Sequence, residues 1–485
     1  MAAPAPIIVW LRLDLRLADN PALTAAVEAG APLLPLYILD DVTLGRWRLG
    51  GASRWWLHGS LAALDKDLRQ RGGRLCVRKG SAPAVLEALL AETGAAAVHV
   101  ARGYEPWEAE FEHSVTALCN ALGAEYRSFG GRLLFEPEAI RTGAGKRYRV
   151  FTPFWKACLT TGAPGAPLPV PKLTRFAEAE SDPLDSLGLL PVRPDWAGGL
   201  LETWQPGEAA ALTRLESFIE RHLVRYAEDR SRLDVDATSR LSPHLHFGEI
   251  SPGQVWHAVS AAASRSGARA ERGVEGGAEA YLRELIWRDF SYHLMSHFPA
   301  MISEPLRPDF ANFPWRNDAH ALAAWKQGST GYPIVDAAMR ELWHTGFMPN
   351  RARMIVASFL VKHLLLPWQV GAEWFLDTLV DADLANNSAS WQWVAGSGTD
   401  AAPYFRIFNP VLQGQKFDPD GAYVRRWVPE LSGLSAPHIH APWHAPELAL
   451  AAARVTLGKS YPLPIVEHGA ARARALAALA TLRTD

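Results

Sequence analysis

Short apolar runs alternate with amphipathic segments over the first 130 residues. Four runs are typical of buried strands and begin at Ile7, Pro32, Arg74 and Ala96 ("IIVWLRL", "PLLPLYIL", "RLCVRKG", "AAVHVAR"). Between them, "SRWWLHGSLAALDKDLRQRGG" and "APAVLEALLAETGA" have helical spacing and end at or near glycine, a common helix stop. This alternation predicts an α/β domain over residues 1–130, a parallel sheet with helices on both faces. Such a sheet binds ligands beyond the carboxyl ends of its strands.

The turn after the first predicted strand reads "LRLDLRLADN". It lacks the G-x-G-x-x-G fingerprint that brings a dinucleotide close to the backbone. The N-terminal domain is therefore not expected to be a Rossmann-type NAD or FAD site.

The pattern changes after residue 130. Residues 131–205 are rich in proline and glycine ("TGAPGAPLPVPKL", "LGLLPVRPDWAGG") and predict an interdomain linker. Residues 206–485 are almost wholly helical in pattern, which predicts a large all-helical second domain. Within it, "YLRELIWRDFSYHLMSHF" carries an apolar stripe, and "RARMIVASFLVKHLLLPW" is apolar nearly all round and predicts a buried helix. The stripe consists of Leu282, Leu285, Ile286 and Phe290.

Composition narrows the function classes. The chain has 485 residues, is 48% hydrophobic and 21% charged, and has a net charge of -2. This charge argues against a general basic coat, so any DNA or RNA site must be a local patch. The three cysteines are not closely paired, which fits a reducing cytosol. With no signal-peptide pattern and no apolar run long enough to span a membrane, we expect a cytoplasmic monomer without a membrane partner.

Two histidine-rich runs resemble metal sites. They are "PHLHF", with His244 and His246, and "PHIHAPWHAP", with His438, His440 and His444. No carboxylate or cysteine stands at a suitable spacing, and proline interrupts the second run. We therefore expect surface or loop histidines and no metal.

Two polar constellations lie in the helical half. In "ATSRLSPHLHFGEISP", Thr238, Ser239 and Ser242 stand at a predicted helix start. Hydroxyls and free backbone N–H groups there can bind phosphate, although a plain capping cluster has the same pattern.

"DADLANN" supplies Asp381 and Asp383, which do not share a helical face and could meet different polar edges of one ligand. Glu284 and Trp287 share a helix face at i, i+3 and could hold a planar polar heterocycle. A buried salt-bridge network with core tryptophans would give the same pattern.

Tryptophan is the unusual residue. The chain has 19, and Trp391 and Trp393 stand one residue apart in "NNSASWQWVAGSGTD". Their neighbours are too small and polar for a buried strand, and an ordinary amphipathic helix would show a different spacing.

Four long motifs carry a resemblance to a known family. They are "WLRLDLRLADNPAL", "ELIWRDFSYHLMSHFP", "TGYPIVDAAMRELWHTGFMPNRARMIVASFLVKHLL" and "DADLANNSASWQWVAGSGTDAAPYFRIFNP". In this order they strongly resemble the photolyase/cryptochrome family, most closely its bacterial class I or III cyclobutane pyrimidine dimer photolyases. The resemblance implies an α/β antenna domain followed by a helical domain that holds a folded FAD and binds damaged DNA.

The resemblance also implies roles by motif position. Arg353 would pair with Asp381 near the isoalloxazine, Asp383 would lie beside it, and Asn387 would face flavin N5. The flavin set is Tyr226, Thr238, Ser239, Arg240, Leu241, Ser242, Asn350, Arg353, Asp381, Asp383 and Asn387. The set for the flipped dimer is Glu284, Trp287, Asn350, Arg351, Met354 and Trp393. The contacts to the DNA backbone are Arg230 and Arg406.

In family terms, Trp391 is the ring nearest the flavin, and Trp368 and Trp315 continue a chain to the surface. Indole is easily oxidised, so such a chain can re-reduce an excited flavin by stepwise hopping. The implied reaction is electron transfer from light-excited reduced FAD to a dimer that has left the DNA helix. This reaction needs no acid/base pair. The resemblance implies that the residues acting in repair or reduction are Glu284, Asn387, Trp391, Trp368 and Trp315. A second branch through Trp374 stays open.

The resemblance leaves alternatives. A cryptochrome-type blue-light photoreceptor is the main one, but plant-type cryptochromes tend to carry Asp where this chain has Asn387, and they often add a long C-terminal tail. A (6-4) photolyase would be expected to show a histidine-rich dimer pocket, which "TGFMPNRARM" lacks. Pro349 stands where the family usually has histidine. The sequence therefore does not determine the shape of the dimer pocket.

The antenna segment is "YEPWE", with Trp107 and Glu108. It resembles the segment that binds folate, with Glu108 at the position of its carboxylate and Trp107 in place of the usual Asn. We expect 5,10-methenyltetrahydrofolate, stacked in part on Trp107, with an 8-hydroxy-deazaflavin as the alternative.

Overall fold

The chain folds into two compact units, each considered by itself. A computed structural model describes residues 4–265, 272–400 and 405–482, with the backbone alone for 272–275. Unit 1 comprises Met1–Val224, Ser239–Pro299 and Val380–Asp383, and unit 2 comprises Arg225–Thr238, Ala300–Leu379 and Leu384–Asp485. The predicted boundaries at residues 130 and 206 stay predictions, because these units are defined by packing and unit 1 includes helices of the predicted second domain.

The centre of unit 1 is a parallel sheet in the order β3-β2-β1-β4-β5. Its strands are β1 (Ile7–Leu11), β2 (Leu33–Leu39), β3 (Cys76–Lys79), β4 (Ala97–Ala101) and β5 (Glu125–Phe129). The first four confirm the predicted runs. The edge strand β5 was not predicted, because its sequence "EYRSF" is mostly polar, has no fully buried residue and gives no apolar run.

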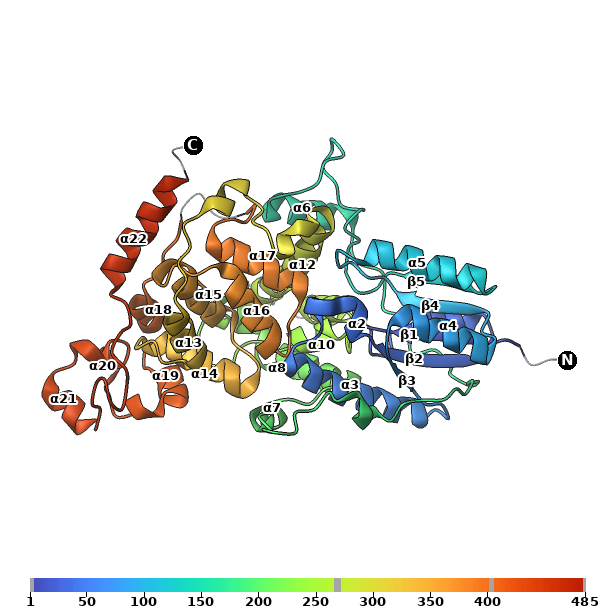
Figure 1. The fold of residues 1–485 in the computed structure, drawn as a ribbon, viewed down its shortest axis with the longest axis horizontal. Coiled ribbons are helices and arrows are strands. Elements are labelled where there is room, and N and C mark those ends of the chain that lie inside the picture. Colours follow the sequence, from blue (N-terminus) through green and yellow to red (C-terminus); the bar gives the residue numbers. More distant parts are fainter. Residues whose placement is uncertain (1–3, 266–271, 401–404, 483–485) are drawn as a thin grey trace. The chain divides into compact units, whose positions relative to one another are not determined.

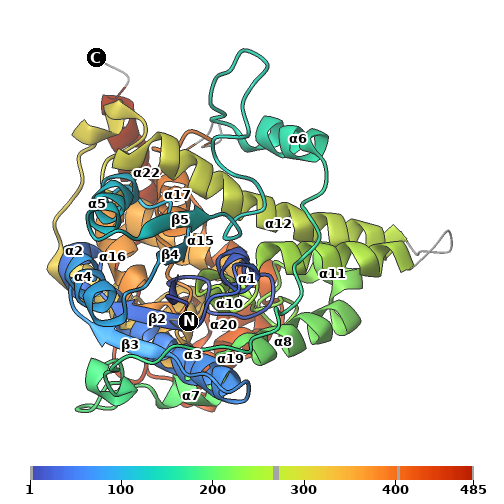
Figure 2. The same ribbon diagram turned by 90° about the vertical axis from the view of Figure 1, so that its right-hand side faces the viewer.

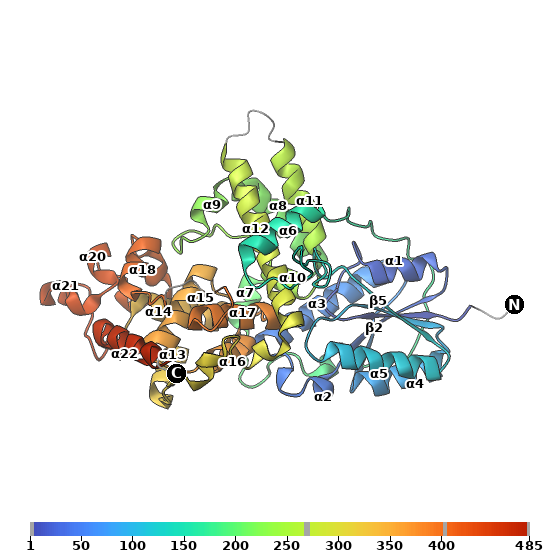
Figure 3. The same ribbon diagram turned by 90° about the horizontal axis from the view of Figure 1, so that it is seen from above.

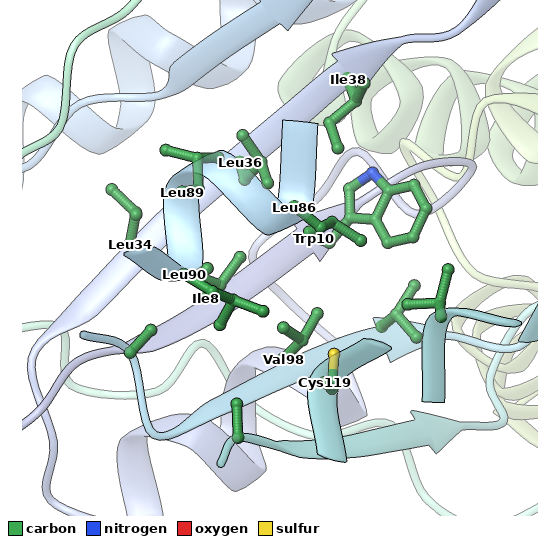
Figure 4. Packing of buried hydrophobic residues seen from close by; sticks show 14 of the residues in the cluster. Ile8, Trp10, Leu34, Leu36, Ile38, Leu86, Leu89, Leu90, Val98 and Cys119 are labelled. Carbon is green, nitrogen blue, oxygen red and sulfur yellow. The ribbon is translucent and has the colours of Figure 1, made fainter. Parts of the chain in front are cut away.

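Helices cover both faces of this sheet, as predicted. They are α1 (Pro21–Glu28), α3 (Gly51–Arg69), α4 (Ala82–Thr93) and α5 (Glu108–Ala121). In Figure 3, α4 and α5 lie on one face and α1 and α3 on the other. Figure 4 shows Ile8, Trp10 and Leu36 of the sheet packed near Leu86 and Leu89 of α4. These side chains are buried, so the apolar runs that predicted strands form the core of the sheet.

The predicted linker is part of unit 1 and has some regular structure. It contains α6 (Phe151–Thr161) and α7 (Gly198–Thr203), and Phe176 forms a parallel β-bridge with Leu33 at the start of β2. Proline and glycine therefore mark a segment that runs along the surface and still makes specific contacts.

The remaining elements are helical. Those of unit 1 are α2 (Asp41–Leu44), α8 (Glu208–Arg221), α10 (Ser242–His246), α11 (Pro252–Arg265) and the long α12 (Arg272–His297), which Figure 2 shows above α11. On α12 the predicted stripe is buried at Leu285, Ile286 and Phe290 and half-buried at Leu282. Those of unit 2 are α9 (Tyr226–Asp229), α13 (Ala319–Gln327), α14 (Pro333–Thr345), α15 (Asn350–Ser358), α16 (Trp368–Thr378), α17 (Leu384–Ala395), α18 (Pro410–Phe417), α19 (Ala422–Trp427), α20 (Ala436–Ile439), α21 (Glu447–Ala452) and α22 (His468–Thr481).

Unit 2 has a helical core (Figure 1). Helix α15 continues as a π-helical segment, Phe359–His363, and residues 355–363 are all buried, which confirms the predicted buried helix. The stretch with Trp391 and Trp393 is helix α17. In the part of the chain that the structure describes, each helix is too short or too polar to cross a membrane.

The prediction of surface or loop histidines is wrong for two of the five, because His244 and His246 lie within a buried helix, α10. His440 is buried after α20, whereas His438 is half-buried and His444 exposed. Two of the buried imidazole rings contact an oxygen of another residue, five residues away for His244 and 22 residues away for His440. His244 Nδ1 contacts the buried carboxylate of Glu249, and His440 Nε2 lies 2.7 Å from the carbonyl oxygen of Asp418.

Candidate active site

In unit 1, the turn after α16 brings a carboxylate to α12. Asp383 is buried, and its Oδ2 accepts a hydrogen bond from the hydroxyl of Tyr292 on α12 at 2.5 Å. His246 Nδ1 of α10 lies 3.5 Å from the same oxygen. Asp381, two residues earlier, is also buried. The two predicted aspartates thus stand in one buried turn, and their contact with different edges of one ligand stays a prediction.

Electrostatics keep Asp383 charged. Burial by itself raises the pKa of this carboxyl, but the adjacent imidazole of His246, with smaller contributions from Arg288 and the hydroxyl of Tyr292, lowers the pKa below its ordinary value. An ionised carboxylate is costly to bury without polar partners. Asp383 therefore provides a fixed negative charge that suits the N–H edge of a polar ring.

The predicted phosphate segment precedes α10. Ser239 Oγ accepts a hydrogen bond from Tyr281 of α12 at 2.9 Å, and Arg240 has a left-handed backbone (φ 50°). Leu241 is buried and Ser242 begins the helix. Thr238, the last residue of its segment in unit 2, is half-buried. A hydroxyl cluster at a helix start is present as predicted, and phosphate binding by it stays a prediction.

Glu284 and Trp287 lie one turn apart on α12, and both are half-buried. The indole of Trp287 stacks on Phe151 of α6, with ring centroids 3.5 Å apart and planes 7° apart. One face of Trp287 is therefore covered by the protein. A base that stacks on this ring must use its other face or its edge.

In unit 2, Trp391 is buried among rings. Its indole packs edge-on against Phe375 and Trp325, with centroid distances of 5.1 and 6.3 Å. It also fills the space beside Gly371, where a Cβ would meet Trp391 Cη2 at 2.2 Å. Gly371 stands one turn after Trp368, which is buried on the same helix, α16. The structure thus brings Trp391 to the helix that carries the second predicted member of the chain.

The third predicted member, Trp315, is half-buried and packs on Phe313 at 4.3 Å between centroids. Trp374 forms a separate pair: it stacks on Trp343, with centroids 6.0 Å apart and planes 4° apart, and Lys326 lies 4.5 Å from its ring. Trp343 is 57% exposed, so this pair reaches the surface.

Asn387 lies on α17, one turn before Trp391. Its Nδ2 donates to the carbonyl oxygen of Ala372 on α16 at 3.0 Å. This hydrogen bond fixes the orientation of the amide, whose oxygen is then directed away from Ala372.

Predicted cations gather in another part of unit 2. Arg351 of α15 lies 4.3 Å from the ring of Phe417 and donates to Ser231 Oγ at 3.4 Å. Burial, and then the charge of nearby Arg230, lower the pKa of Arg351. Arg353 Nε donates to the carbonyl oxygen of Met348 at 2.7 Å. The structure thus places Arg230 and Arg351 together, whereas the pairing of Arg353 with Asp381 stays a prediction.

The other predicted residues of unit 2 vary in exposure. Asn350 and Arg406 are exposed, Met354 and Trp393 are half-buried, and Tyr226 is buried.

The predicted antenna residues lie near the carboxyl end of β4. Arg12, directly after β1, pairs with Glu108 at 2.7 Å and donates to the carbonyl oxygen of Ala101 at 2.7 Å. Trp107 stacks on Trp47, with centroids 6.5 Å apart and planes 22° apart. The carboxyl ends of β1 and β4 meet where the strand order reverses, which is the usual ligand position in such sheets.

The residues that sequence reasoning missed include Tyr292, Trp47, His246 and Gly371. Tyr292 and Trp47 stand far along the chain from Asp383 and Trp107, so spacing could not connect them. His246 was assigned to the surface. Gly371 gave only the weak signal of a glycine within a helical pattern.

Comparisons with known proteins identify the family and agree with the fold. Residues 7–172 match the family model for DNA photolyase, and residues 281–481 match the FAD binding domain of DNA photolyase. A deoxyribodipyrimidine photo-lyase of Agrobacterium fabrum is 50% identical over 99% of this chain and 98% of its own length. Cryptochrome-1 of Arabidopsis thaliana is 40% identical over 98% of this chain and 70% of its own. The crystal structure of a bacterial class III photolyase from Agrobacterium tumefaciens matches with a TM-score of 0.95 and 49% identity, over 100% of this chain and 99% of that one.

Proposed function

The chain belongs to the photolyase/cryptochrome family, and on that premise we propose that it is a light-driven DNA repair enzyme that splits cyclobutane pyrimidine dimers. The observation that carries the proposal is the 50% identity to a deoxyribodipyrimidine photo-lyase across nearly the whole of both chains. We assign it to the class III type on the TM-score of 0.95 to a photolyase of that class.

We propose FAD as the cofactor, and the residues present fit it. Asp383 offers a buried negative charge with its pKa held low, and the turn also buries Asp381. In the described part of the chain, the buried indole N–H of Trp391 has no hydrogen-bond partner. Bound and reduced, FAD supplies the electron that opens the cyclobutane ring. Tyr226, Arg240 and Asn387, with the other residues of the predicted flavin set, would hold it.

For the substrate, we propose that the dimer leaves the helix and rests on α12. Unstacking costs a few kcal/mol, least for damaged bases, which supplies part of the selectivity. Glu284 would hydrogen-bond the pyrimidine edge, and the uncovered side of Trp287 would contact the dimer. Phe151, stacked on Trp287, holds that ring in place. Arg230 and the exposed Arg406 would bind the DNA backbone, and Arg351, close to Arg230, would line the dimer pocket.

The chain's own tryptophans would re-reduce the cofactor. We propose the route from Trp391 through Trp368 to Trp315, because Trp391 lies against α16 one turn from Trp368. A branch through Trp374 and its exposed partner Trp343 is the second route that the geometry supports.

For the antenna we propose 5,10-methenyltetrahydrofolate bound near Trp107, with an 8-hydroxy-deazaflavin as the alternative. Trp47 adds a second, nearly parallel indole. Glu108 is already paired with Arg12, so we propose that it acts by fixing Arg12 as much as by contacting the pigment. The absorption spectrum of the released pigment distinguishes the two.

One experiment distinguishes a cryptochrome-type photoreceptor from a DNA repair enzyme. The purified protein, proposed to be a cytoplasmic monomer, is mixed with dimer-containing DNA and illuminated with blue light, and the remaining dimers are counted. Loss of dimers that depends on light supports the repair enzyme. If dimers persist and damaged DNA is bound no better than undamaged DNA, the photoreceptor reading replaces it.

A further inference from the structure

A cluster of positive charge lies in the predicted linker, before and within α6. Residues 141–156 read "RTGAGKRYRVFTPFWK", which contains no aspartate or glutamate. The whole chain has 49 Lys and Arg against 51 Asp and Glu, so this segment departs strongly from the average. Lys146, Arg147 and Arg149 are all exposed. We call residues 146–149 the basic strap.

The charges of the strap are not neutralised by the protein. Nearby Arg141 forms an ion pair with Glu138. Among residues 4–265, 272–400 and 405–482, no carboxylate forms an ion pair with Lys146, Arg147 or Arg149. Three like charges within four residues repel one another, and an external anion relieves that repulsion.

The strap is nevertheless held against α12. The backbone N–H of Tyr148 donates to His293 Nε2 at 3.2 Å. The guanidinium of Arg149 lies 4.6 Å from the ring of Phe298, just beyond the end of α12. Burial lowers the pKa of His293 to about 4, so the ring is neutral at pH 7 and its acceptor nitrogen is available. An anchored strap loses less conformational entropy on binding than a free loop would.

The basic strap lies close to Trp287, because Phe151 connects the two. Phe151, which stacks on Trp287, follows Arg149 by two residues, a reach of about 7 Å at most. Successive phosphates of one DNA strand are about 3.4 Å apart along the helix axis. The distance from Phe151 to Arg149 therefore corresponds to about two phosphates. A strand whose base contacts Trp287 would therefore carry its phosphates within reach of the strap.

We propose that the basic strap is a contact for the DNA backbone beside the lesion, in addition to the cations of unit 2. The proposal rests on the proposed function for its partner, since a repair enzyme must bind DNA. Arginine presents a planar fork that binds phosphate oxygens in pairs, and the ring of Phe298 keeps the fork of Arg149 in place. Phosphate contacts are indifferent to the base, so the strap contributes equally on damaged and undamaged DNA.

The test is the salt dependence of binding. Affinity for an undamaged duplex and for the same duplex with one dimer is titrated in the dark at several salt concentrations. Each phosphate contact contributes about 0.9 to the slope of log K against log salt. The triple variant Lys146→Gln/Arg147→Gln/Arg149→Gln is expected to lower the slope by about 2 to 3, and to do so equally for both duplexes.

A matched variant controls for net charge. Lys66→Gln/Arg71→Gln/Arg74→Gln removes one lysine and two arginines that are also exposed, at the end of α3 and just after it. Figure 2 shows α3 below the sheet and α6 above it. This control is expected to keep the wild-type slope. Arg149→Lys, which keeps the charge and loses the fork, is expected to keep the slope and weaken the binding.

The outcomes separate the strap from the proposed function. A strap variant with the wild-type slope, or a control with an equal loss, overturns the strap proposal. The strap proposal is also overturned if the triple strap variant binds DNA normally but no longer binds vesicles containing phosphatidylserine. If the slope falls as expected but wild type shows no light-dependent loss of dimers, the strap stands as a DNA contact and the repair function fails.

Discussion

The indole of Trp391 occupies the space that a side chain at Gly371 would need. A Cβ there would lie 2.2 Å from Trp391 Cη2 and 2.6 Å from Leu360 Cδ2. Both distances are shorter than atoms tolerate, so α16 can approach α17 this closely only because residue 371 is glycine. The proposed electron route from Trp391 to Trp368 depends on that approach.

Gly371→Ala is therefore expected to disturb both packing and photoreduction. Overpacking a core costs about 1–3 kcal/mol, which urea unfolding measures. Displacement of Trp391 should also slow photoreduction of oxidised FAD. Gly276→Ala on α12 is the control: no atom lies within 4 Å of its added Cβ, so it should leave stability unchanged or slightly raised.

Combining the change with Trp391→Phe provides an internal check, because phenylalanine lacks the outer ring atoms of the clash. The double variant should lose less stability than the sum of the two single variants. Strict additivity would show that the clash is absent.

Trp391→Phe alone is expected to slow photoreduction greatly and to leave repair by chemically pre-reduced enzyme nearly intact. The physical reason is that phenylalanine is far harder to oxidise than indole. Flash photolysis measures the first step, and dimer counting measures the second. Unchanged photoreduction would indicate that electrons flow through Trp374 and Trp343 instead, and Trp374→Phe would test that route.

The sequence predicted elements correctly where a continuous run of residues is buried. It predicted little where burial or a contact involves a single residue. The runs at β1 and β4 predicted strands because both faces of the sheet are covered, whereas the exposed edge β5 left no signal. Asp383 could be proposed from its motif. Its partner Tyr292 could not, since a polar tip on a helix of mixed character has no periodic signature. The buried His244 was misjudged because the covering ring of Trp56 comes from tertiary packing, and because only the turn after α10 brings Glu249, five residues later, back to the imidazole.

Asp289 is expected to make stability depend on pH. Burial raises the pKa of this carboxyl to about 7, and Arg288 and the N–H groups of Phe135 and Leu134 offset only part of that rise. The folded state therefore holds a proton between about pH 4 and 7 that the unfolded chain has released. Because the folded state binds more protons, its stability falls as pH rises through that window.

Asp289→Asn removes this titration and keeps an acceptor oxygen for both N–H groups. Between pH 5 and pH 8, the stability of the variant relative to wild type should improve by about 2–3 kcal/mol. Denaturant unfolding of both proteins at the two pH values measures the difference, in which the shared histidines cancel. An equal difference at both pH values would mean that Asp289 titrates normally.

Trp287 is expected to distinguish damaged from undamaged DNA. Stacking of a base on an aromatic ring is worth about 1–3 kcal/mol in single-strand binders, or roughly ten- to a hundredfold in affinity. Trp287→Ala should weaken binding to dimer-containing DNA by about that factor and leave undamaged duplex almost unaffected. Phe151 covers one face of the indole at 3.5 Å, so the loss must come from the other side of the ring.

Trp287→Phe and Phe151→Leu divide this effect into its parts. The first keeps a flat apolar ring and should retain part of the preference for damaged DNA. The second removes the supporting ring while leaving Trp287, and should lower the preference only as far as the indole becomes mobile. Titrations of damaged and undamaged duplex at one salt concentration give both ratios, and thermal unfolding confirms that each variant is folded. A Trp287→Ala variant that loses affinity equally for both duplexes would place Trp287 in general DNA binding, because a lesion-specific contact cannot act on a base that stays in the helix.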